Sequence, residues 1–256
     1  MLHDKLIKKC FTILTVILLS FAPSGWASKA DLDAELKDYI NSFSNSGFAK
    51  QRKAIDSLGW AGISDPRLYD IIESKLLADF QSEDKQTLKR MPWYAKALGL
   101  SGNDKYQATL EKVLDEAESR KIRKHSKLAL QLLDRHKQWN PVITQGLAKA
   151  PTGRLEQTRV SNMIKAEDPA LVRIGDKRVY YAHGDSVQLL NAARDRLLKD
   201  YQAVGRNKDH IDAVAWLCKA LANSGKPEYR RALETVADNA ENKKVAKYAK
   251  KYAGYL

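Results

Sequence analysis

Apolar residues recur at helical spacing along most of the chain. In the segment 32–43, leucine, tyrosine, isoleucine and phenylalanine lie three or four positions apart, which places them on one face of a helix. Asp65-Pro66 has the form of a helix cap followed by proline at the first helical position, and the same apolar spacing continues through 68–80. The pattern predicts an all-α protein built from short helices.

Two prolines mark expected irregularities in this pattern. Pro92 lies inside one helical segment, where proline removes a backbone hydrogen bond, so we expect a kink there. Asn140-Pro141 again resembles a cap and a first helical residue. We therefore expect a short helix to begin at that point.

The chain contains an internal duplication. The segment that starts at Trp93, WYAKALGLSGNDKYQATLEKVLDEAESRKIRKHSK, aligns without a gap with the segment that starts at Trp216, WLCKALANSGKPEYRRALETVADNAENKKVAKYAK. Upstream, LLADF in the first copy matches LLKDY in the second after a small difference in length. Fixed-period similarity is typical of repeat architectures. It predicts two related halves, 28–139 and 140–256.

Helix pairs of one form occur in both halves. An alanine-rich helix ending in Leu-Gly or a similar pair precedes an aliphatic helix, and a Lys/Arg-rich helix with a central alanine follows. The matching stretches are KQRKAIDSLGWAGISDPRLYDIIESKLL, WYAKALGLSGNDKYQATLEKVL, SRKIRKHSKLALQLL, WLCKALANSGKPEYRRALETVA and NKKVAKYAKKYA. Over most of 46–256 the chain resembles HEAT repeats, most closely those of phycobilisome-lyase-like proteins. The resemblance implies an α-solenoid of stacked helix pairs that binds other macromolecules, and it transfers no active-site residue.

One segment departs from the helical pattern. ALVRIGDKRVYYAHGDS carries strand-type residues around Gly175-Asp176, a two-residue turn signal. We expect a small β-hairpin insertion at about 170–183 in the second half, without a counterpart in the first. Its candidate binding residues are Arg173, Arg178, Tyr180 and Tyr181. A packing flap over the edge of the solenoid is the alternative interpretation.

The N-terminus has the composition of a secretory signal peptide. Lys5, Lys8 and Lys9 precede the apolar run FTILTVILLSF, and small residues follow at Gly25 and Ala27. The run is about half of the roughly 20 residues that span a bilayer. We therefore expect 1–27 to be removed after Ala27, leaving a periplasmic or secreted protein without a membrane span. A retained anchor is the alternative.

The charge of the chain is strongly positive. The formal net charge is +13, and removal of the predicted signal lowers it by two. A basic exported protein attracts anionic polymers, such as acidic glycans, lipopolysaccharide or nucleic acid. Basic residues cluster on the polar sides of two related helices: Arg120, Lys121, Arg123, Lys124, Lys127, Lys243, Lys244, Lys247, Lys250 and Lys251. Simple solvated faces are the favoured explanation for these residues, and both the export signal and the mixed charge of neighbouring helices disfavour nucleic acid.

The sequence carries no recognisable catalytic or metal-binding motif. It lacks HExxH, GxGxxG, the phosphate loop and the GxSxG elbow. Cys10 leaves with the signal, so Cys218 is alone and cannot form an intramolecular disulfide. Cys218 aligns with Ala95, which favours a small core residue over a nucleophile. We predict a protein that is not an enzyme and needs no cofactor or metal, and an enzyme of unknown type is the third-ranked alternative.

These observations together predict a bacterial scaffold or adaptor that binds a protein partner in the cell envelope. The alternative is a cationic module that binds an anionic polymer through its lysine-rich helices. The two differ in their response to salt, because polymer binding weakens steeply as salt rises and apolar docking does not.

Overall fold

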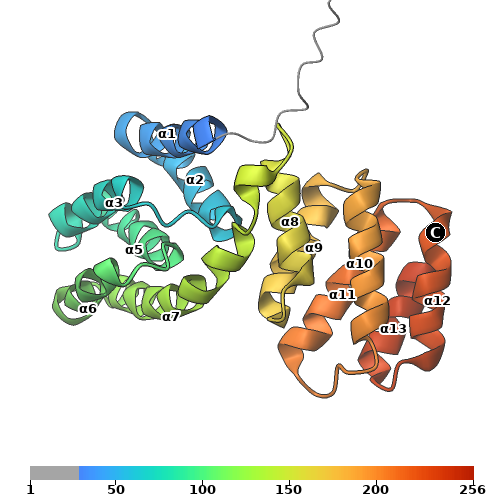
Figure 1. Cartoon of the computed structure of the whole chain (residues 1–256). Helices are drawn as coiled ribbons and strands as arrows, with labels where there is room; N and C mark the ends of the chain where they lie inside the picture. Colours follow the sequence, from blue (N-terminus) through green and yellow to red (C-terminus); the bar gives the residue numbers. More distant parts are fainter. Residues whose placement is uncertain (1–28) are drawn as a thin grey trace, which may run out of the picture.

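The computed structural model describes residues 29–256, so the predicted signal at 1–27 lies outside the described residues. This part of the chain is all-helical, without a β-strand, and the prediction of an all-α protein is confirmed for it (Figure 1). The first-half helices are α1 (Lys29–Asn45), α2 (Phe48–Ala61), α3 (Pro66–Asp79), α4 (Lys85–Leu88), α5 (Met91–Leu100), η1 (Asp104–Tyr106), α6 (Gln107–Glu116) and α7 (Arg120–Ile143). The second-half helices are η2 (Leu147–Lys149), α8 (Leu155–Lys165), α9 (Pro169–Ala182), α10 (Val187–Asp200), α11 (Lys208–Asn223), η3 (Pro227–Tyr229), α12 (Arg230–Asn239) and α13 (Lys243–Ala253).

The longer helices alternate between two layers. One layer contains α1, α3 and α6 in the first half and α8, α10 and α12 in the second; the other contains α2, α5 and α7, then α9, α11 and α13. Helices pack in pairs across the two layers, α1 with α2, α3 with α5, α6 with α7, α8 with α9, α10 with α11 and α12 with α13, and neighbouring pairs also contact within the layers. Figure 1 shows the first half in blue to green and the second in yellow to red. The arrangement agrees with the predicted α-solenoid, in which stacked helix pairs share a core.

The buried apolar side chains form two clusters, one within residues 36–129 and one within 139–253. Helix α7 contributes to both, with Ile122 and Ala129 in the first cluster and Trp139 and Ile143 in the second. The predicted boundary between 139 and 140 therefore falls within a continuous helix. The division into two halves at that position remains a prediction.

The expected helix start at Asn140-Pro141 is wrong, because both residues lie inside α7. Asn140 is buried, and its side-chain amide donates hydrogen bonds to Ser64 Oγ at 3.0 Å and to the carbonyl oxygens of Leu100 and Ser101 at 3.1 and 3.0 Å. Such tertiary bonds replace the capping role that the pair has at a helix start. Asn140 thus ties α7 to the end of α5.

Pro92 does not kink a helix. Helix α5 begins at Met91, so Pro92 lies in its first turn, where the missing N–H has no intrahelical partner in any case. The helical segment is interrupted between α4 and α5, whereas α11 in the second half is one continuous helix. The proline therefore separates two helices that correspond to one helix in the other copy.

The predicted β-hairpin at 170–183 is wrong, because this segment forms helix α9. Asp168 caps the helix, and its carboxylate accepts a hydrogen bond from the Ala170 N–H at 2.8 Å. Pro169 occupies the first helical position. The pair repeats the arrangement of Asp65-Pro66 at the start of α3.

Gly175 marks a close helix crossing and not a turn. A Cβ atom at this position would lie 3.0 Å from the Met163 Cβ and 3.1 Å from the Ile164 nitrogen, both on α8. Glycine therefore lets α8 and α9 approach closely, and neighbouring Asp176 is fully buried. The glycine of Gly175-Asp176 is therefore explained by the close packing of two helices and not by a turn.

The two halves repeat one tyrosine contact. The Tyr106 hydroxyl donates to Asp70 Oδ1 at 2.8 Å, and the Tyr229 hydroxyl donates to Asn191 Oδ1 at 3.1 Å. Tyr106 and Tyr229 are aligned residues in the duplicated segments. Each of these buried tyrosines therefore makes one polar bond within the layer that contains α3 and α6 in the first half and α10 and α12 in the second.

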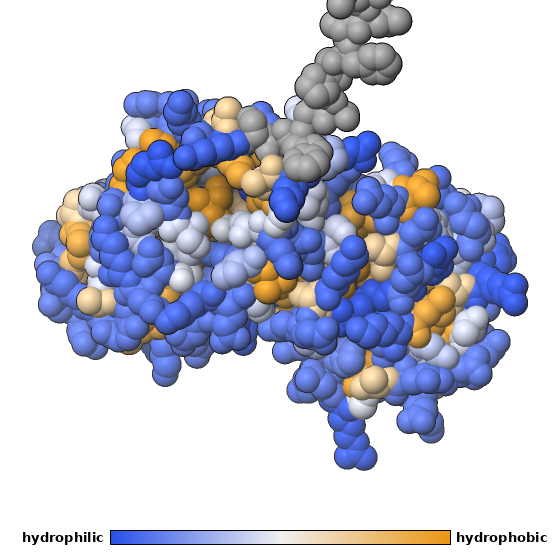
Figure 2. All heavy atoms as spheres, in the orientation of Figure 1, coloured by the Kyte–Doolittle hydropathy of each residue, from blue (hydrophilic) through white to orange (hydrophobic). Residues whose placement is uncertain are grey.

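The surface seen in Figure 2 is mostly hydrophilic, with apolar side chains in small separate groups. Across residues 29–256, no helix combines the length and hydrophobicity that crossing a bilayer requires.

Candidate binding surface between helices α2, α9 and α11

Three aromatic rings cluster on the outer side of α9 and α11. Tyr180 and Tyr181 have ring centroids 4.8 Å apart, and both lie near Trp216, at 5.7 and 6.1 Å. Tyr181 is 68% exposed, which is high for a large aromatic side chain beside other rings. We call this cluster, with the adjoining part of α2, the junction surface.

A hollow of about 370 Å³ lies between α2 and α9 at the edge of this cluster. We call it the junction hollow. Its lining residues are Gly59, Trp60, Ile174, Lys177, Arg178 and Tyr181. A Cβ atom added at Gly59 would meet nothing within 4 Å, so the glycine leaves open space above the α2 backbone. Trp60 comes from the first half but packs against the second core cluster, so the hollow lies where the halves meet.

Cations already lie over the aromatic faces of the junction surface. The Arg178 guanidinium is 4.3 Å from the centre of the Trp60 ring. The Lys177 and Lys219 ammonium groups are 4.9 and 4.2 Å from the centre of the Trp216 ring. Each such contact contributes about 0.5–1 kcal/mol at an exposed site. The side chains thereby hold one another in place around the hollow.

Carboxylates neutralise the arginines of α9. Arg178 Nε donates to Glu156 Oε1 at 3.0 Å, and Arg173 pairs with Asp212 at 2.8 Å. Burial alone would raise the pKa of Glu156, but the hydrogen bond and charge of Arg178 lower this pKa below its ordinary value. Among the ion pairs of residues 29–256, none includes Lys177 or Lys219.

The structure places three of the four residues predicted for the hairpin at the junction surface, although on a helix, and Arg173 pairs with Asp212 elsewhere on α9 and α11. Tyr180 and Tyr181 belong to the ring cluster, Arg178 lies over Trp60, and Arg173 is held by its ion pair. Sequence reasoning missed Gly59, Trp60, Lys177, Trp216 and Lys219, which complete the surface. Helical spacing of Lys177 and Tyr181 would have placed these two on one face, but a strand was expected there.

The ten candidate basic residues form two separate faces. Five lie at the start of α7 and five on α13, in different halves of the molecule (Figure 1). All are exposed except Arg123, which is partly buried and donates to the carbonyl oxygens of Ala117 and Glu118. The structure therefore does not join them into one continuous basic surface.

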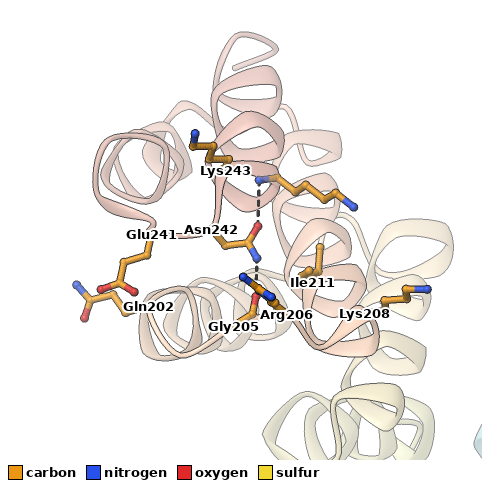
Figure 3. A pocket seen from close by; sticks show the side chains of 9 residues that line it. Gln202, Gly205, Arg206, Lys208, Ile211, Glu241, Asn242 and Lys243 are labelled. Atoms are coloured by element: carbon orange, nitrogen blue, oxygen red, sulfur yellow. Dashed lines mark hydrogen bonds between the residues drawn. The ribbon is translucent and has the colours of Figure 1, made fainter.

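The α13 face borders a second hollow, of about 580 Å³, near the start of α11 (Figure 3). Asn242 spans it, donating to the Gly205 carbonyl at 2.6 Å and accepting from the Lys244 N–H at 3.0 Å. In Figure 3 the Lys208 and Lys243 side chains extend away from Asn242. These cations face solvent and do not converge on one point.

A buried acidic residue distinguishes the second half from the first. Asp176 is fully buried, and neither of its carboxylate oxygens has a hydrogen-bond partner. Burial raises its pKa well above the ordinary value, with Arg196 opposing and Asp200 adding to the rise. Helices α2 and α9 have equal length, and Ile55 occupies the position in α2 that Asp176 occupies in α9.

Within residues 29–256, no cluster of His, Cys, Asp and Glu has the arrangement of a metal site.

Cys218 is buried beside this acidic residue. Burial raises the pKa of its thiol to about 12, so the thiol is protonated at neutral pH. A thiolate is the nucleophilic form of cysteine. The environment of Cys218 is that of a core side chain.

The chain is similar to a solved structure, that of human deoxyhypusine hydroxylase in complex with glycerol. The similarity covers 85% of this chain and 82% of that chain, with 13% sequence identity and a TM-score of 0.32. No protein-family model matches the chain, and no curated protein matches it.

The prediction that the protein is not an enzyme is corrected by this comparison. The matching solved structure is a hydroxylase and therefore an enzyme, so the prediction is withdrawn. A TM-score of 0.32 carries no argument for a particular activity, and no chemistry is transferred to this chain.

Proposed function

We propose that this is an exported helical-repeat protein of the HEAT type that binds a protein partner in the bacterial envelope through its junction surface. The observation that carries the proposal is the exposed Tyr181 ring beside an apolar-lined hollow between the two halves. Aromatic residues and arginine are enriched at the centres of protein interfaces, where a few side chains in pockets dominate the binding energy. Trp60, Tyr181 and Arg178 have that composition and arrangement.

Export is the second part of the proposal, and the N-terminal sequence supports it. Lys5, Lys8 and Lys9, the short apolar run and Ala27 have the order of a cleavable signal. Fractionation of the producing cell and the intact mass of the recovered chain test this part. A periplasmic or secreted chain that starts at Ser28 is the expected result, and a full-length cytoplasmic chain would overturn it.

A photo-crosslinking amino acid at position 181 tests partner binding in the full chain. We expect a discrete protein adduct that persists at high salt, because apolar docking is screened little by ions. The same label at Leu128, an exposed position on α7, is the matched control and should not give that adduct. The filling substitution Gly59→Leu should abolish the adduct. Equal adducts at both positions, or one that persists in Gly59→Leu, would contradict the proposal.

A cationic module for an anionic polymer is the second candidate function. The observation in its favour is that none of the ten basic residues on α7 and α13 takes part in an ion pair within residues 29–256. Affinity for such a polymer should fall steeply with salt. Replacement of Lys247 and Lys250 by glutamate should weaken it, whereas Gly59→Leu should not.

A further inference from the structure

The junction hollow is lined by Lys177, and Lys219 lies over the Trp216 ring of the same surface. Among the ion pairs of residues 29–256, neither lysine has a carboxylate partner. We propose that the hollow takes one large apolar side chain from an acidic segment of the partner, whose flanking aspartate or glutamate side chains pair with Lys177 and Lys219. The inference rests on the proposed function, because it specifies the chemistry of the partner at the same surface. Four observations support it: the open space at Gly59, the cations that cover the faces of Trp60 and Trp216, the absence of carboxylate partners for Lys177 and Lys219 within residues 29–256, and the carboxylates that pair with Arg173 and Arg178.

The floor of the hollow is the backbone of α2 at Gly59. No atom lies within 4 Å of a Cβ built there, and Trp60, Ile174 and Tyr181 form the walls. The counterpart of Gly59 in α9 is Tyr180, so the second copy has a ring where the first has space. The hollow is therefore shaped for a side chain that enters from outside.

The aromatic rings are poorly placed to stack on sugars or nucleic-acid bases. Stacking needs a free ring face, but Arg178 lies over Trp60 at 4.3 Å and Lys219 over Trp216 at 4.2 Å. Lys177 also lies 4.9 Å from the Trp216 centre. Insertion beside the rings, into the hollow, fits this arrangement better than stacking upon them.

The charges favour a short acidic segment over a long polyanion. Arg173 and Arg178 already have carboxylate partners, so Lys177 and Lys219 are the cations left for an incoming carboxylate. Asp212 and Glu156 neutralise those two arginines, so they leave this surface with two uncompensated cations, Lys177 and Lys219. A short acidic segment matches two cations, whereas a long polyanion gains affinity in proportion to the number of cations it contacts.

A fluorescein-labelled peptide tests the inference with the purified full chain. In the parent peptide one tryptophan is flanked on both sides by aspartate and glutamate. One comparison peptide has alanine for the tryptophan, and another has serine for every acidic residue. Fluorescence anisotropy should show that the parent binds at least about tenfold more tightly than either. Equal binding of the parent and the alanine peptide would overturn the inference.

Two variants locate the binding. Gly59→Leu starts from a position where an added Cβ meets no atom of another element within 4 Å, so its side chain extends into the hollow and should weaken the parent peptide at least about tenfold. The double variant Lys177→Glu with Lys219→Glu should weaken the acidic peptide by a similar factor and leave the serine peptide unchanged. Lys247→Glu with Lys250→Glu on α13 is the matched charge control and should have no effect. Circular dichroism must show unchanged helicity in each.

The outcomes separate the inference from the proposed function. If the serine peptide binds as tightly as the parent and Gly59→Leu abolishes both, the surface docks a partner but the acidic chemistry is wrong. If binding resists Gly59→Leu and is displaced by polyglutamate, the junction surface is not the site and both proposals fail. If no peptide binds while the position-181 adduct forms, the inference fails and the proposed function stands.

Discussion

Arg159 binds Glu35 through two parallel hydrogen bonds, with N–O distances of 2.8 and 2.6 Å. Arg159 lies on α8 and is almost fully buried, whereas Glu35 lies on α1 and is about a quarter exposed. The pair therefore joins the first helix of one half to the first helix of the other. Glu156 in α8 is the counterpart of Glu35 in α1, and it binds Arg178 at the junction surface. The two equivalent glutamates therefore bind different arginines.

Replacement of the Glu35 carboxylate by an amide should destabilise the protein, because the charge of Arg159 would then be buried without a counter-charge. We expect Glu35→Gln to lower the free energy of unfolding by about 1–3 kcal/mol, because Arg159 then keeps its buried charge without a full counter-charge. Urea denaturation monitored by circular dichroism measures the change. Asp33→Asn is the control, because its 3.5 Å contact with Arg67 is exposed and solvent screens it, so the substitution should change stability much less. Equal effects of the two substitutions would contradict the prediction.

Asp176 should make stability fall as pH rises. Its pKa is raised in the folded state, so the folded chain holds a proton that the unfolded chain releases above about pH 4. This contribution is present below about pH 4 and is lost as pH rises through the raised pKa. Relative to Asp176→Asn, the wild-type protein should therefore lose unfolding free energy as pH rises from about 4 toward the raised pKa. Urea denaturation across that range measures the difference.

Asp70 is a control, because its contribution to stability should change with pH in the opposite direction. Hydrogen bonds from Lys105 and Tyr106 lower its pKa, so its contribution is present at neutral pH and is lost as pH falls through that lowered pKa. Relative to Asp70→Asn, the wild-type protein should gain stability as pH rises. A wild-type curve parallel to that of Asp176→Asn would show that Asp176 is not buried as described.

Alanine substitutions at two helical glycines should have opposite effects on stability. A Cβ at Gly99 would lie 2.4 Å from the carbonyl oxygen of Ala129, so Gly99→Ala should destabilise the protein by about 1–3 kcal/mol or more. Gly59→Ala meets no atom within 4 Å and should stabilise by up to about 1 kcal/mol through helix propensity. Thermal and urea denaturation of the two variants test the contrast. A loss of stability in both would refute the open space at Gly59.

Cys218 should be unreactive in the folded protein. Its buried thiol has a pKa raised to about 12, so little thiolate exists at neutral pH and reagent access is blocked. In a Cys10→Ser background, an aromatic disulfide reagent should modify Cys218 slowly in buffer and rapidly in concentrated urea. Rapid modification in buffer would indicate an exposed, activated thiol.

Helical spacing predicted the α-helical class, because apolar positions three and four apart mark a buried helix face wherever they occur. The capping pair Asp65-Pro66 was predicted correctly. Asp168-Pro169 has the same chemistry and was missed, because the β-branched residues after it favour a strand. The error at Gly175 arose because a glycine at a helix crossing and a glycine in a turn look alike in a sequence. Only the position of α8 distinguishes them.

The junction hollow could not be predicted from the sequence. It joins Gly59 and Trp60 to Ile174 and Tyr181, more than a hundred positions away, and neither pair carries a motif. Their proximity depends on how the two halves meet around α7 and α8. The exposure of Tyr181 and the ion pairs of Arg173 and Arg178 depend on the same packing.

Helix α7 also has a mechanical consequence. Its 24 residues span about 36 Å and enter both apolar cores, so the halves share a continuous strut in place of a linker. Pro141 removes one backbone hydrogen bond in the last turns of this helix, where it enters the second core. A partner that touches both copies must therefore match a spacing that is set by one helix and its packing.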